Sequence, residues 1–287
     1  MRRAITIRDE LDQIRTVEEL TGVFESVASI KIARIRNRVI ASKEYFAELW
    51  QTYRGLRIDP KEQLKRTSKK RNNKNVLVAV TAEGKLGGEI GNKVIEEVVR
   101  AHAETHNTDV IVLGAHGAEQ LAHRGVQVAQ TFHLPVSDTQ FDVTDMIAVL
   151  DEYEQISVFY QTYESLRVQR VARIELVSAV RELSDEINQA EQEADVELLT
   201  SHEYIFEPGI TEIADYLETL MMGVALTQVL MESKLAQHAS RFNAMHAAKQ
   251  KAVEMGGEYS LQFHRAKRAE GDERLKEIMK VFKELTA

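Results

Sequence analysis

Proline is almost absent from this chain of 287 residues, occurring only at Pro60, Pro135 and Pro208. Because proline interrupts helices and central strands, each of the three predicts a boundary. Before Pro60, from Ile5 to Tyr53, apolar residues recur every three or four positions, at Leu11, Ile14, Leu20, Phe24, Val27 and Ile30. This spacing predicts one face of a single helix of about 50 residues, roughly 70 Å long, which few globular domains can bury.

A second long helix is predicted from Thr211 to Leu285, where proline is again absent. It would be roughly 110 Å long, and we expect Gly256 and Gly257 to interrupt or kink it. Within it, residues 232–252 read "ESKLAQHASRFNAMHAAKQKA", a strongly helical composition with few large apolar side chains. So thin an apolar stripe suits a slender rod that touches a partner along its length.

The segment between the two helices changes pattern. Short apolar runs of strand type alternate with amphipathic runs of helix type, which indicates a small α/β domain. Strands are predicted at 75–82, 109–115 and 126–132, helices at 88–106 and 144–155, and two further strands in 156–177 around a turn near Glu164–Leu166. Residues 182–200 are acidic and poor in apolar side chains, so we expect a mobile connection there.

The predicted fold class is therefore α/β. The N- and C-terminal helices form a long antiparallel coiled coil, and a small central α/β, Rossmann-like domain lies between them in the sequence. The predicted boundaries are 1–58 for the N-terminal coiled-coil helix, 59–74 for a basic connection, 75–208 for the α/β domain and 209–287 for the C-terminal coiled-coil helix.

Charge is distributed unevenly, although the formal net charge is −8. Residues 1–75 carry 18 Lys and Arg against 10 Asp and Glu, and residues 225–287 carry 11 against 8, so two basic ends flank an acidic centre. A partner with acidic loops explains this as well as nucleic acid does, and no nucleic-acid motif appears, so no nucleic-acid partner is expected. We also expect no signal peptide and no membrane span.

Chemical sites are weakly indicated. Cysteine is absent, which excludes disulfides, thiolate metal sites and cysteine catalysis. The turn "TAEGKLGGEIGN" at 81–92 could cradle a phosphate or be a tight turn, but it lacks the spacing of the known nucleotide-binding loops. His102 and His106 stand four residues apart without an evident third metal ligand, and His116 and His123 lack a nearby nucleophile. We therefore predict no catalytic residue, no cofactor and no metal.

Basic side chains offer a different kind of site. Lys31, Arg34 and Arg38 are spaced to share one face of the first helix, and Arg241 and Lys249 lie on the second. Such residues often form only a solvated face. Here the helices are too long to be covered by their own domain, which makes contact with a partner equally plausible.

Four motifs, distributed along the chain, resemble the gamma subunit of F-type ATP synthases, the central rotor shaft. The opening "IRDELDQIRTVEELTGVFESVASIKIARIRNR" is similar to that family's first helix, and "TAEGKLGGEIGN" to its glycine turn. The most specific is "VLMESKLAQHASRFNAMHAA", close to the family pattern "ES..SE.A.RM.AM..A". "YIFEP" at 204–208 is similar to the start of the family's C-terminal helix.

The resemblance implies a non-catalytic subunit of a two-sector ATPase. Its terminal helices would turn inside a ring of alpha and beta subunits, and its α/β domain would form a foot, with the epsilon subunit, on the membrane c-ring. The complex would lie on the cytoplasmic face of the inner (plasma) membrane. The candidate residues for contact with partners are Lys31, Arg34, Arg38, Glu232, Arg241, Met245, Lys249, Lys267 and Arg268.

The chain also departs from the family pattern. Lys267-Arg268 stands where the family has Arg-Gln, and Gly271-Asp272 where it has Ile-Thr. A gamma-like subunit of a specialised hydrolytic or sodium-pumping ATPase therefore stays open. Two other classes also remain: a coiled-coil adaptor without rotary partners, and a nucleotide-binding enzyme built on the α/β domain.

Overall fold

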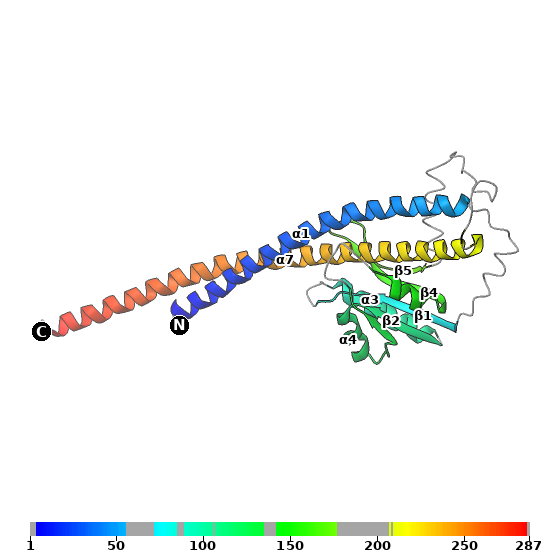
Figure 1. The fold of residues 1–287 in the computed structure, drawn as a ribbon. Coiled ribbons are helices and arrows are strands. Elements are labelled where there is room, and N and C mark those ends of the chain that lie inside the picture. Colours follow the sequence, from blue (N-terminus) through cyan, green and yellow to red (C-terminus); the bar gives the residue numbers. More distant parts are fainter. Residues whose placement is uncertain are drawn as a thin grey trace. The chain divides into compact units, whose positions relative to one another are not determined.

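The computed structural model describes residues 4–55, 72–84, 89–105, 107–134, 142–176, 207 and 209–285. Its elements are α1 (Ala4–Gly55), β1 (Asn72–Val80), α3 (Ile90–Glu104), β2 (Thr108–Leu113), α4 (Ala115–His123), β3 (Gln130–Phe132), α5 (Thr144–Leu150), β4 (Tyr153–Tyr163), β5 (Gln169–Glu175) and α7 (Ile210–Leu285) (Figure 1). The chain divides into two compact units. One comprises Met1–Ser29 with Arg241–Ala287, here called the helical unit, and the other Ile30–Ser240, here called the α/β unit.

The α/β unit contains one five-stranded sheet with the strand order β3-β2-β1-β4-β5. Strands β1, β2, β3 and β4 run parallel, and β5 is antiparallel to β4. Parallel neighbours need crossover connections, and α3 and α4 supply those between β1, β2 and β3. The predicted α/β class with long terminal helices is thereby confirmed.

Both faces of the sheet are apolar, as expected of parallel strands covered on both sides. Side chains alternate along β1, so Val76, Val78 and Val80 pack on the face that carries α5 and part of α7. Leu77 and Ala79 point to the opposite face, against α3.

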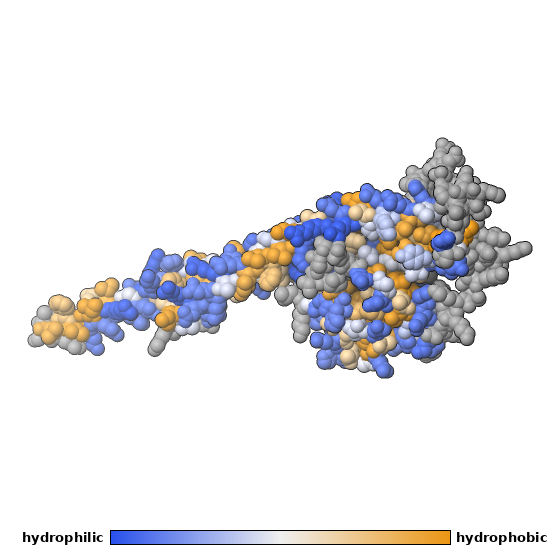
Figure 2. All heavy atoms as spheres, viewed as in Figure 1, coloured by the Kyte–Doolittle hydropathy of each residue, from blue (hydrophilic) through white to orange (hydrophobic). Residues whose placement is uncertain are grey.

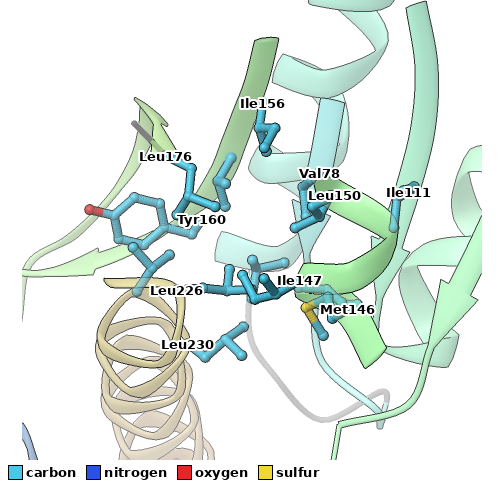
Figure 3. Packing of buried hydrophobic residues seen from close by; sticks show 14 of the residues in the cluster. Val78, Ile111, Met146, Ile147, Leu150, Ile156, Tyr160, Leu176, Leu226 and Leu230 are labelled. Atoms are coloured by element: carbon cyan, nitrogen blue, oxygen red, sulfur yellow. The ribbon is translucent and has the colours of Figure 1, made fainter. Parts of the chain in front are cut away.

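One stretch of α7 belongs to the sheet's own core. Leu226 and Leu230 of α7 lie among the buried side chains of α5 and the sheet, near Ile147 and Tyr160 (Figure 3). By length and composition alone, α7 contains a stretch apolar enough to cross a membrane. Part of that stretch is buried against the sheet, which accounts for some of its apolar side chains.

Helices α1 and α7 are antiparallel in each unit. In the α/β unit, Ile35 of α1 packs with Met231 and Leu235 of α7, and further along α1 Leu49 packs with the earlier Leu217. In the helical unit, the backbone N–H of Ala4 donates to Glu270 Oε1 at 2.8 Å, and Ala4 and Ile7 cluster with Ala266.

Several element boundaries differ from the sequence prediction. The third strand is limited to Gln130–Phe132, and the helix predicted to reach residue 155 ends at Leu150, because β4 begins at Tyr153. Helix α4 was not predicted. Its Gly117 has no room for a side chain, since an added Cβ would lie 2.3 Å from Thr81 Oγ1. The placement of α4 therefore depends on a tertiary contact, which the local sequence pattern does not show.

The interruption expected at Gly256 and Gly257 is wrong, because α7 continues through both to Leu285. Glycine costs about 1 kcal/mol relative to alanine inside a helix, which a long packed helix can absorb. Gly256 also lies against α1, where an added Cβ would be 3.7 Å from Ile14. The predicted connections at 59–74 and 182–200 fall almost wholly or wholly outside the described residues.

Candidate functional site

The face of α1 toward α7, here called the inner seam, follows a heptad spacing. Its positions alternate in steps of three and four, the pattern that keeps two helices in contact over many turns. Buried members are Ala4, Ile7, Leu11, Thr21 and Ala28 in the helical unit and Ile35 and Phe46 in the α/β unit. Most seam residues of the helical unit are small, which makes the helix pair slender.

This finding corrects the single face expected from the sequence. Leu11 is buried and Ile14 half-buried, but Leu20, Phe24 and Val27 are exposed. A helix turns 100° per residue, so the six-residue step from Ile14 to Leu20 leaves the inner seam. The prediction from apolar spacing therefore assigned residues of two different faces of α1 to a single face.

The exposed residues Val17, Leu20, Phe24 and Val27 recur in steps of three and four and form a second stripe, here called the outer stripe. Each is one position before a residue of the inner seam, so the outer stripe runs beside it. Next to the stripe, a groove of about 520 Å³ is lined by residues of both helices, among them Ile14, Val17, Ala252 and Met255. This apolar face is open to a partner.

One charged cluster interrupts the inner seam of the helical unit. Glu25 Oε1 lies 2.8 Å from His246 Nδ1, and Lys249 Nζ donates to Glu25 Oε2 at 3.2 Å. The His246 and Lys249 hydrogen bonds outweigh desolvation and lower the pKa of the Glu25 carboxyl below its ordinary value. The lysine side chain lies beside Gly22, where an added Cβ would be in ordinary contact with Lys249 Nζ at 3.6 Å.

The end of α7 carries a further exposed apolar face, here called the C-terminal apolar face. It consists of Leu275, Ile278, Met279, Phe282 and Leu285. Their spacing places them along one side of the helix. Figure 2 shows hydrophobic residues at the surface near this terminus.

The predicted contact residues are spread over both units and do not form one patch. Arg34, Arg38, Lys267 and Arg268 are exposed, and Lys31, Glu232, Arg241, Met245 and Lys249 are half-buried. Lys249 belongs to the Glu25 cluster. The sequence analysis did not identify Glu25 and His246. The heptad spacing of α1 could have placed Glu25 on the inner seam.

The described part of the glycine turn offers a carboxylate where a phosphate would need cations or N–H groups. Glu83 accepts hydrogen bonds from the backbone N–H groups of Leu134 at 2.5 Å and Ala115 at 3.3 Å. Its own negative charge therefore occupies the first turn of α4. Residues 85–88, with most of the glycines, lie outside the described residues.

The histidine pairs do not assemble into a site. His102 Nδ1 is buried without a hydrogen-bond partner on α3, and His106 lies outside the described residues. His116 Nε2 lies 3.1 Å from Gln120 Nε2, while His123 is exposed at the end of α4. Among the residues that the structure describes, no group of three or more His, Asp or Glu could hold a metal ion.

Comparison with known proteins gives one consistent result. The family model described as ATP synthase matches residues 4–283. The ATP synthase gamma chains of Geobacter metallireducens and Geotalea daltonii are 26% and 24% identical, and each alignment covers 96% of both chains.

Solved structures show the same fold. A chain of the Euglena gracilis mitochondrial ATP synthase superposes with a TM-score of 0.62 at 12% identity, covering 98% of this chain and 94% of that one. A chain from the central stalk and c-ring structure of the Tetrahymena thermophila mitochondrial enzyme gives a TM-score of 0.54 at 17% identity, covering 80% and 99%.

Proposed function

Because this chain belongs to the ATP synthase gamma family, we propose that it is the central-stalk rotor subunit of such a complex. It couples ion flow through the membrane ring to conformational change at the catalytic sites of the alpha and beta subunits. The chain itself contributes no nucleotide chemistry. The observation that carries this proposal is the outer stripe. It is an exposed apolar face of α1, whose inner seam already packs against α7.

The helical unit has the properties of a shaft inside a ring. Its inner seam is built largely from small residues, so the pair is thin enough to be surrounded. The outer stripe lies on α1, whereas α7 exposes Val253 and Leu261 in a different arrangement, so a surrounding ring meets different surfaces around the pair. Each catalytic site of the ring therefore contacts a different surface at any moment.

This asymmetry supplies the mechanism. A site whose conformations contact the shaft differently is shifted toward the conformation that contacts it best. When the shaft turns, the preferred conformation passes from one site to the next. The energy that drives the change is the difference in binding between shaft and site, so it requires contacts that can be broken and remade.

Charged contacts meet that requirement. Arg34 and Arg38 are exposed, as are Lys267 and Arg268 near the end of α7. Exposed ion pairs contribute about 0.2–1 kcal/mol each and are screened by salt. Basic residues facing acidic loops of the beta subunits would guide the shaft without locking it to any one of them.

The two units would have different partners. The C-terminal apolar face suits an apolar bearing formed by the alpha and beta subunits. The sheet and its helices would form the foot, in contact with the epsilon subunit and the c-ring. The complex would then lie on the cytoplasmic face of the inner membrane, attached through its partners.

Co-expression with the alpha and beta subunits encoded beside this chain tests the proposal. We expect a complex that contains one copy of this chain per catalytic head and that hydrolyses ATP only when the chain is present. The matched control is the same co-expression without this chain. Free chain together with an active head that never binds it would contradict the rotor function and favour the adaptor alternative.

A further inference from the structure

A buried polar cluster connects the sheet to α7 within the α/β unit. It consists of Gln161 of β4 and Ser233 and Gln237 of α7, and is here called the Gln161 cluster. Gln161 and Ser233 are 0% exposed and Gln237 is 7% exposed. Polar groups buried this deeply need hydrogen-bond partners, so their arrangement is informative.

The side chain of Gln161 connects two elements. Its Nε2 donates to the carbonyl oxygen of Val80, the last residue of β1, at 3.2 Å. Its Oε1 accepts hydrogen bonds from the Ser233 hydroxyl and from Gln237 Nε2, the latter at 3.2 Å. Gln237 Nε2 also donates to Ser233 Oγ at 3.1 Å. The end of the central strand is therefore tied to α7 through one amide.

These hydrogen bonds fix the position of α7 along and around its axis, which the neighbouring apolar contacts cannot do. Leu226 and Leu230 attach α7 to the sheet by burial, which is non-directional and tolerates small shifts. A shift of α7 by one helical turn moves Ser233 and Gln237 by about 5.4 Å and breaks the hydrogen bond that each makes to Gln161. Buried polar groups left without partners are costly, so the cluster permits one axial and one rotational position.

We propose that the Gln161 cluster is a positioning device that fixes α7 against the sheet, so that torque passes between the foot and the shaft helix without slippage. The torque part of this inference rests on the proposed rotor function. The positional part does not, and it is testable on the isolated chain.

Two sets of substitutions separate positioning from stability. Gln161→Leu alone removes the acceptor that the buried Ser233 and Gln237 share and should lower the melting temperature by about 5 °C. The triple variant Gln161→Leu, Ser233→Ala, Gln237→Leu removes these side-chain polar groups together. It should melt closer to the wild type than Gln161→Leu does, because replacing polar partners jointly by apolar groups is nearly neutral and only the Val80 carbonyl oxygen loses its side-chain donor.

A cysteine pair reports the position of α7. An added Cβ at Gly223 of α7 lies 3.6 Å from Val143 Cγ2, and the chain has no cysteine of its own. In the isolated chain, Gly223→Cys with Val143→Cys should form a disulfide readily, and more slowly when the triple variant is added. Equal rates in the two backgrounds would overturn the proposal, whatever the chain's partners are.

The assembled, membrane-bound complex tests the transmission of torque. The triple variant should hydrolyse ATP but pump fewer ions per ATP than the wild type, and oxidation of the cysteine pair should restore pumping. The same pair in the wild-type background is the control and should change nothing. Undiminished pumping by the reduced triple variant would overturn the inference, whereas a wild-type chain that never assembles would instead contradict the rotor function.

Discussion

Glu25 shows how one residue sets the alignment of two helices. It occupies a position of the inner seam where apolar contact would be expected, and it pairs there with His246 and Lys249 of α7. The lysine side chain reaches it beside Gly22 of α1. A charge at a seam position costs stability but specifies which residues face each other.

Glu25→Gln should destabilise the helical unit by about 0.5 kcal/mol near neutral pH, because the neutral amide keeps the shape but loses the charge. The pKa of Glu25 is lowered in the folded chain. Its contribution is therefore fully present above the ordinary glutamate pKa of 4.5 and is lost as pH falls through the lowered folded value.

Thermal unfolding of the two chains, followed by circular dichroism across this pH range, measures that effect. The stability difference should shrink toward zero in acid. Glu19→Gln, at an exposed position of the same helix, is the control and should show little difference at any pH. A difference that persists or grows in acid would contradict the charged role of Glu25.

At the scale of the element, α1 presents two apolar stripes with different tasks. Ala28 of the inner seam is 1% exposed, and its neighbour Val27 of the outer stripe is 43% exposed. The same substitution at these two adjacent positions therefore separates folding from assembly, with identical charge and nearly identical helix position.

Ala28→Glu should destabilise the chain by about 3 kcal/mol, because it places an unpaired charge between two packed helices. Val27→Glu should change the stability of the isolated chain by less than about 0.5 kcal/mol but should weaken its capture by the alpha and beta subunits. Thermal unfolding and co-purification measure the two effects. Normal assembly of the Val27→Glu chain would show that the outer stripe is not a contact surface.

Helix lengths and the α/β class followed from the sequence because proline positions and apolar runs are local signals. The faces of α1 did not, because the inner seam contains Ala4, Thr21 and Ala28, which apolar periodicity does not count. Helix α4 was missed because it depends on the close approach of Gly117 to Thr81. The Gln161 cluster joins residues 72 positions apart, which no local pattern reveals.

At the scale of the whole molecule, a rotor and an adaptor differ in what a covalent bond to the surroundings does. A rotor must turn relative to the head, whereas α1 and α7 turn together. A bond between the two helices should therefore leave function intact, and a bond from either helix to the head should abolish it. An adaptor that never turns tolerates both bonds.

Two cysteine variants of the otherwise cysteine-free chain make this comparison in the assembled complex. Gly256→Cys with Ile14→Cys joins α7 to α1, since an added Cβ at Gly256 lies 3.7 Å from Ile14 Cγ2. We expect ATP hydrolysis and ion pumping to continue when this pair is oxidised. Leu20→Cys, labelled with a maleimide photo-crosslinker on the exposed outer stripe, should lose activity on illumination in proportion to the fraction crosslinked to alpha or beta subunits. Full activity of the crosslinked fraction would exclude rotation, and loss of activity from the helix-to-helix bond alone would mean that α1 and α7 must move against each other.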